Sequence, residues 1–203
     1  TLILTTIFLI FEINDAPTVA DSTESFVRLK SDYALMLSQC ILGIVAMLLP
    51  GMLENKFKIA IPSYMLILYT IFLYAAIYLG EVRSFYYNVP NWDNILHTFS
   101  GAMIGALGFS IVTLLNKTEK VPIVLSPLFV ALFSFCFAVT LGVIWEFYEF
   151  TFDGILGLNM QKFALENGTQ LIGRAALTDT MVDLFVDAVG AFIMSVIGYI
   201  SLR

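Results

Sequence analysis

The chain has 203 residues, 59% of them hydrophobic, and a formal net charge of -6. Soluble domains are about 45–50% apolar, so a soluble fold of this length would expose much apolar surface, and lipid is the natural solvent. The acidic balance excludes a nucleic-acid-binding role, because that role needs a basic face.

Six apolar segments follow one another along the chain, and a membrane-spanning helix needs about 20 such residues. The first, Thr1–Phe11, is short, and we expect a trimmed helix there rather than the remnant of a signal segment. The other five are Tyr33–Leu49, Ile59–Leu79, Ile95–Leu115, Val121–Phe147 and Met181–Leu202. The sequence therefore predicts an all-α fold, a polytopic membrane helix bundle of about six transmembrane helices in one domain, 1–203.

The polar segments between these spans differ in length. Leu53–Lys58 and Asn116–Lys120 are short, whereas Glu12–Asp32, Gly80–Asn94 and Tyr148–Thr180 are longer. With six spans, the short and the long segments fall on opposite sides of the membrane. Each side carries five Lys and Arg residues, but the short side packs them into fewer positions. We therefore place the short segments in the cytoplasm and expect the long, acidic segments to face outward.

Polar residues recur at one end of three of the predicted spans. Asp93 and His97, the chain's one histidine, are four residues apart at the start of the fourth span and share a helical face. Glu146, Glu149 and Asp153 end the fifth span at spacings that also give one face if the helix continues. A single such residue is often a helix cap, a solvated loop acid or a headgroup-level histidine.

The sixth span begins with a stripe of three carboxylates. Asp179, Asp183 and Asp187 recur every four residues, and alternation of the spans puts all three polar ends on one side of the membrane. Small residues that let membrane helices approach closely continue these faces, at Gly101, Gly105, Gly108, Ala138, Gly142, Gly190 and Ala191. Intramembrane carboxylates are costly and usually functional or paired. We therefore expect the three helices to converge on one acidic site.

Seven carboxylates and one imidazole cannot all be charged side by side without partners. Protons, Arg83 and Arg174 from the outer segments, or a bound divalent metal are the alternatives. An oxygen-rich set with one imidazole suits Mg²⁺, Ca²⁺, Mn²⁺, Fe²⁺ or Zn²⁺. The predicted metal ligands are Asp93, His97, Glu146, Glu149, Asp183 and Asp187. Glu146 or His97 is the predicted catalytic base, and Arg83, Arg174, Asp153 and Asp179 are predicted to bind substrate.

At these positions the chain resembles small bacterial inner-membrane proteins of the YjdF type and, more loosely, the VanZ-like proteins. The motifs that carry the resemblance are Asp93-Asn94-Ile95-Leu96-His97 followed by Ser100-Gly101, then Trp145-Glu146-Phe147-Tyr148-Glu149-Phe150, and finally Gln170, Asp179-Thr180-Met181-Val182-Asp183, Asp187 and Gly190-Ala191. The resemblance covers about residues 80–200. The resemblance implies a multi-pass protein of the bacterial plasma membrane, and it does not imply a reaction.

Three functions are compatible with the sequence. The first is a metal-assisted hydrolase or transferase acting on a membrane lipid or a lipid-linked cell-envelope substrate. The second is an ion- or proton-coupled transporter or solute-binding membrane subunit, because intramembrane acids often mark ion paths. The third is a structural or regulatory membrane partner whose polar cluster only fixes helix packing. The sequence names neither the metal, nor the reaction, nor an oligomeric state.

Overall fold

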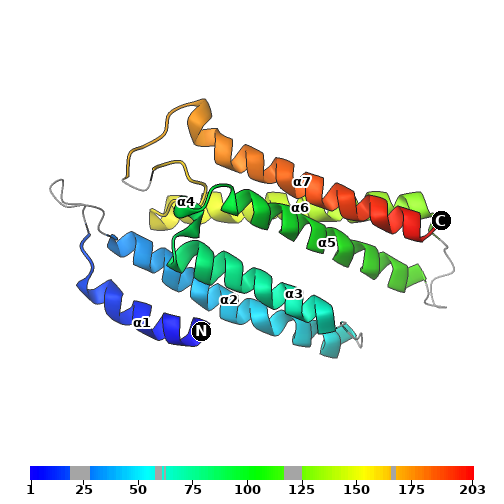
Figure 1. Ribbon diagram of the computed structural model, residues 1–203, viewed down its shortest axis with the longest axis horizontal. Coiled ribbons are helices and arrows are strands. Elements are labelled where there is room, and N and C mark those ends of the chain that lie inside the picture. Colours follow the sequence, from blue (N-terminus) through cyan, green and yellow to red (C-terminus); the bar gives the residue numbers. More distant parts are fainter. Residues whose placement is uncertain (19–27, 58–60, 62, 117–124, 166–167) are drawn as a thin grey trace. The chain divides into compact units, whose positions relative to one another are not determined.

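A computed structural model describes all residues except 19–27, 58–60, 62, 117–124 and 166–167 (Figure 1). The described residues form α1 (Leu2–Asp15), α2 (Lys30–Phe57), α3 (Ser63–Leu73), the π-helix η1 (Tyr74–Val82), α4 (Phe85–Asn88), α5 (Trp92–Asn116), α6 (Pro127–Leu156) and α7 (Arg174–Ser201). Their one departure from helix and loop is an isolated bridge between Ala164 and Gln170. The predicted all-α fold is confirmed.

Five stretches of the described chain are long and apolar enough to cross a membrane. They are α2, α3 together with η1, α5, α6 and α7, and each overlaps one of the five long spans expected from the sequence. The first residues of the expected spans Ile59–Leu79 and Val121–Phe147 lie partly outside the described residues. The short first segment is helical as well, but α1 has 14 residues, fewer than the about 20 that a span needs. The chain is therefore a multi-pass membrane protein, and its described residues contain five candidate spans.

The chain forms two compact units, the first comprising residues 1–92 and 156–158 and the second Asp93–Ile155 and Asn159–Arg203. The prediction of one domain over 1–203 stays a prediction. In the first unit, α1, α2, α3 and η1 pack around six buried apolar side chains, Leu2, Leu9, Met36, Cys40, Leu73 and Ile77. Cys40 is thus a buried thiol, whereas Cys136 on α6 is exposed.

The first unit also fixes the turn that leads into α5. Ser84, two residues after the end of η1, has a left-handed backbone (φ 56°), and the Arg28 guanidinium donates to its hydroxyl (2.8 Å) and to the Val82 carbonyl (3.0 Å). The indole N–H of Trp92 donates to the carbonyl of Ala75 in η1 (3.3 Å). Trp92 is also the first residue of α5.

In the second unit, α5 and α7 approach so closely that their main chains touch. A β-carbon added at Gly101 would collide with the main chain of Asp187, and one added at Gly190 would collide with the main chain of Thr98. On α6, a β-carbon at Gly142 would lie 2.8 Å from the Asp187 carboxylate. The expected convergence of three helices on small residues is therefore confirmed, and it brings the polar ends of α5, α6 and α7 together.

Candidate metal centre

The stripe of carboxylates on α7 lies inside the helix rather than at its cap. The helix begins at Arg174 after Gly173, so Asp179 is already more than one turn in and is no N-cap. Asp183 and Asp187 are 1% and 4% exposed. Among the described residues, Oδ1 of Asp183 has no hydrogen-bond partner. A buried carboxylate oxygen without a donor is costly, so the site favours a cation or a proton at this position.

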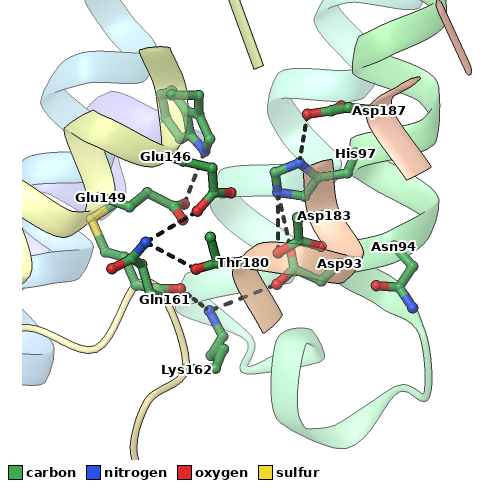
Figure 2. Close-up of polar contacts among 12 residues, drawn as sticks. Asp93, Asn94, His97, Glu146, Glu149, Gln161, Lys162, Thr180, Asp183 and Asp187 are labelled. Carbon is green, nitrogen blue, oxygen red and sulfur yellow. Dashed lines mark hydrogen bonds and ion pairs between the residues drawn. The ribbon is translucent and has the colours of Figure 1, made fainter. Parts of the chain in front are cut away.

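His97 of α5 lies among three carboxylates (Figure 2). Its Nδ1 is 3.2 Å from Oδ2 of Asp187, within hydrogen-bonding distance. Its Nε2 is 3.6 Å from Oδ1 of Asp93 and 3.8 Å from Oδ2 of Asp183. The two ring nitrogens therefore face different partners, one carboxylate on one side and two on the other.

Asp187 holds the imidazole ring in this orientation. Its second oxygen, Oδ1, accepts a hydrogen bond from the Ser100 hydroxyl (2.9 Å), which fixes the carboxylate that faces His97 Nδ1. The ring then presents Nε2 to Asp93 and Asp183. One ligand atom from each of Asp93, His97 and Asp183 lies within 4.8 Å of the others, close enough to hold one ion.

The acidic face of α6 is buried, as the spacing predicted. The helix continues to Leu156, and Glu146, Glu149 and Asp153 are 5%, 8% and 7% exposed. Glu149 accepts a hydrogen bond from the indole of Trp145 (2.9 Å). Glu146 accepts one at Oε2, whereas its Oε1 has no partner among the described residues. Figure 2 shows that Glu146 faces His97 across the site.

The loop after α6 folds back over the acidic ends of the helices. The Asp153 carboxylate accepts the backbone N–H groups of Met160 (2.7 Å) and Gln161 (3.0 Å). The Gln161 amide then donates to Oε2 of Glu146 (3.2 Å) and to the hydroxyl of Thr180 on α7 (2.9 Å). The loop thus links α6 to α7 and supplies donors to the site.

The next loop residue, Lys162, brings a positive charge to the site. Its Nζ lies 3.9 Å from Oδ2 of Asp93 and donates to the carbonyl of Met160 (3.0 Å). Lys162, Gln161, Ser100 and Thr180 are not among the site residues predicted from the sequence. Nothing in their spacing marks the two loop residues, because only the fold of the loop brings them back to the helices.

The structure separates the six predicted metal ligands into two groups. Asp93, His97 and Asp183 converge on one point, whereas Asp187, Glu146 and Glu149 each have another hydrogen-bonding partner. The four predicted substrate-binding residues are also dispersed. Asp153 is committed to the loop, Asp179 is half-buried, Arg174 is exposed at the start of α7, and Arg83 is exposed in the first unit. Their predicted roles stay predictions.

Comparison with known proteins places the chain in a family. A protein of Thermotoga maritima, described as an uncharacterized protein, is 32% identical over 132 residues, which are 64% of this chain and 58% of that protein. The chain thus spans less than two thirds of that relative's length. No solved structure matches it. The YjdF and VanZ names do not occur in these matches, so that finer resemblance stays a prediction. A family model described as a predicted membrane protein (DUF2238) matches residues 22–203, and the chain belongs to this membrane protein family.

Proposed function

We propose that this membrane protein binds a divalent cation through Asp93, His97 and Asp183 and uses the ion to hydrolyse or transfer a lipid or lipid-linked substrate. One observation carries the proposal. Two carboxylate oxygens lie 3.6 and 3.8 Å from the same imidazole nitrogen, inside a membrane protein where buried carboxylates are costly. Two ligands of a tetrahedral ion, each about 2.1 Å from it, lie about 3.4 Å apart. Each carboxylate oxygen therefore lies within a few tenths of an ångström of that spacing from Nε2, and all three ligand atoms lie within 4.8 Å of one another.

The surroundings of His97 support the same proposal. A histidine that binds a metal through one ring nitrogen usually donates its other N–H to a carboxylate or a carbonyl. Asp187 meets His97 at Nδ1, and Ser100 holds Asp187 in turn. In the tautomer in which Nδ1–H donates to Asp187, Nε2 carries no proton and can bind the proposed ion. We therefore assign Asp187 to orienting the ligand, and His97 to the ion rather than to proton transfer.

A three-ligand set supports a catalytic ion rather than a structural one. Catalytic zinc sites have three protein ligands and keep the fourth position for water or substrate. A bound ion would make a water molecule more acidic, and a nearby base would have to take the proton of that water. Glu146 faces His97, and its Oε1 accepts no hydrogen bond among the described residues. Glu146 is therefore our candidate base.

The place of the site in the helices supports a lipid or lipid-linked substrate. Asp93 lies in the first turn of α5 and Asp183 in the third turn of α7, near the end of each span. A headgroup at the membrane surface can reach this depth while its acyl chains stay among the lipids. We further propose that the protein is bacterial, lies in the plasma membrane and presents this site outward, because the basic residues are denser in the short segments.

A transport function is the second candidate, and one observation favours it. Ser195 lies about two helical turns after Asp187 on the buried side of α7 and is 4% exposed. Its hydroxyl has no hydrogen-bond partner among the described residues. Polar side chains along one buried face are a feature of ion and proton paths. A purely structural role is the third reading, in which His97 and Lys162 offset the carboxylates without any ion.

Metal analysis of the detergent-purified protein separates these readings. The proposal expects one tightly bound divalent ion per chain, which Asp183→Asn removes. Titration with Mn²⁺, followed by the electron paramagnetic resonance signal of the free ion, gives the affinity of the emptied site. A protein that is purified without metal and takes up no Mn²⁺, Zn²⁺ or Mg²⁺ rules out the metal-dependent function and leaves the structural or proton-coupled readings. Phosphate or fatty-acid release from lipid substrates then tests catalysis.

A further inference from the structure

The Asp93 carboxylate connects the proposed ion to a second positive charge. Its Oδ1 faces Nε2 of His97 (3.6 Å), whereas its Oδ2 faces Nζ of Lys162 (3.9 Å). An ion bound by Oδ1 therefore lies one carboxylate away from an ammonium group. The side chains of Asp93 and Lys162 are 20% and 18% exposed, against 2% for Asp183, so these two residues form the open edge of the site.

The fold of the loop, and not only the length of the side chain, positions Lys162 at this edge. Its backbone has a left-handed conformation (φ 49°), which is uncommon for a residue with a side chain, and its ammonium is also held by the Met160 carbonyl. The Asn159 amide bonds both the N–H (2.9 Å) and the carbonyl (2.7 Å) of Ala164, and Asp153 bonds the backbone ahead of Lys162. The loop thus has a defined shape that presents this lysine to the site.

Three of the other carboxylates have their own donors. Glu149 accepts from Trp145, Asp153 accepts two backbone N–H groups, and Asp187 meets His97 and Ser100. Hydrogen bonds of this kind stabilise the charged form of a carboxylate. Oε1 of Glu146 and Oδ2 of Asp179 have no hydrogen-bond partner among the described residues. At the open edge, an ion bound to Asp93 and Asp183 would lie beside Lys162, so two positive charges would face the same opening. A ligand with several anionic oxygens is the kind that can bridge two such charges.

We infer that the substrate group of this site is a phosphoryl group, with one oxygen on the ion and another on the ammonium of Lys162. The inference rests on the proposed metal site and narrows its substrate from phosphoryl or acyl to phosphoryl. A phosphoryl group carries several anionic oxygens around one atom, so it can bridge two cations, and lysine is a common phosphate ligand. An acyl carbonyl offers one neutral oxygen, which the ion alone would satisfy. The phosphoryl group can belong to a lipid headgroup or to free phosphate.

The test measures phosphate beside the ion directly. Bound Mn²⁺ relaxes the ³¹P nucleus of a phosphoryl group that lies within a few ångströms of it. The full chain in dodecyl maltoside, saturated with Mn²⁺, is titrated separately with inorganic phosphate, dihexanoyl phosphatidic acid and dihexanoyl phosphatidylcholine. We expect relaxation beyond that caused by free Mn²⁺. A preference for phosphatidic acid identifies a lipid headgroup as the source, and a preference for inorganic phosphate identifies the free ion.

Variants at one position then assign the role of the lysine. Lys162→Met should weaken phosphoryl binding about tenfold or more while Mn²⁺ still saturates the site, because a charge-assisted contact is lost. Lys162→Arg should retain most of the affinity. Arg203→Met removes one positive charge at the far end of α7 and should change nothing. The result is specific to Lys162 only if that control behaves like the wild type.

Two outcomes overturn the inference, and they are distinguishable. If Mn²⁺ binds to the wild-type protein but relaxes none of the three phosphorus compounds, or relaxes them equally in Lys162→Met, the phosphoryl assignment is wrong and the metal site stands. If the wild-type protein binds no Mn²⁺, the proposed function and this inference fall together. Occupancy of the metal site is measured in every sample, so the two failures cannot be confused.

Discussion

Gly101 of α5 faces the main chain of Asp187 on α7, with no room for a β-carbon between them. The same contact that packs the two helices therefore places the carboxylate that orients His97. One turn below, Gly105 is different, since a β-carbon there would lie 3.4 Å from the main chain of Ala191, an ordinary van der Waals distance. Alanine substitutions at these two glycines of one helix face should therefore affect stability differently.

Gly101→Ala should destabilise the protein by about 1–3 kcal/mol, because the two helices must separate to admit the methyl group. Gly105→Ala should stay within about 1 kcal/mol of the wild type, since alanine fits and favours a helix. Thermal unfolding in one detergent measures both. Equal melting temperatures for Gly101→Ala and the wild type would show that α5 and α7 do not pack through this contact.

The same glycines show how far the sequence predicts the fold. Hydropathy alone identifies the five spans, because about 20 apolar residues in a row have few other uses. The spacing of Gly101, Gly190 and their neighbours predicts that α5, α6 and α7 converge, since small residues mark close contacts between membrane helices. The sequence shows no sign of the π-helix η1, because a widened helical turn has no residue pattern of its own.

For the site, the sequence predicts which residues gather but not which atoms meet. Helical spacing brings Asp93, His97, Asp183 and Asp187 to one place, as the structure confirms. The division between Asp183, beside Nε2, and Asp187, beside Nδ1, depends on the orientation of the ring, which periodicity does not encode. Lys162 was missed because its position depends on tertiary hydrogen bonds of the loop rather than on any spacing along the chain.

Chelation should destabilise the wild-type protein. An ion that binds only the folded state stabilises that state by mass action, so its removal lowers the melting temperature and its return restores it. Protons compete with the ion for the same ligands, so lowering the pH should weaken metal binding in the same direction. Differential scanning fluorimetry with a chelator, followed by each divalent ion, measures the effect. A melting temperature that neither chelator nor any added ion changes would contradict the proposed metal site.

Asp183→Asn and Asp187→Asn should differ, although both remove one negative charge from the same helix face. Asp183 is a proposed ligand, so its amide variant should lose nearly all Mn²⁺ binding. Asp187 orients the ligand His97, and loss of such a partner weakens metal binding about 10–100-fold without abolishing it. Titration with Mn²⁺ measures both affinities. The reverse order, with Asp187→Asn the more damaging, would make Asp187 the direct ligand and exchange the proposed roles.

Glu146→Gln separates catalysis from binding. The amide keeps an oxygen for the Gln161 contact but cannot take a proton, so Mn²⁺ affinity should stay within a few-fold of the wild type, while release of phosphate or fatty acid from a lipid substrate should fall about 10²–10⁴-fold. The paired measurement matters, because a fall in both quantities would make Glu146 a fourth ligand. Unchanged turnover would exclude it as the base.

Cysteine labelling tests on which side of the membrane the site lies. Asn88 precedes α5 and is exposed, Ile172 is 87% exposed in the loop before α7, and Asn55 is exposed near the end of α2. In a Cys136→Ser background, with the buried Cys40 left in place, we expect an impermeant maleimide to label Asn88→Cys and Ile172→Cys in intact cells. Asn55→Cys should react only after the membrane is permeabilised, because the denser basic residues of the short segments favour a cytoplasmic position for that end.

The expected pattern leaves the acidic ends of α5, α6 and α7 open to envelope substrates. The opposite pattern would turn the site toward the cytoplasm, and the substrate would then have to be a lipid of the inner leaflet or a soluble phosphate.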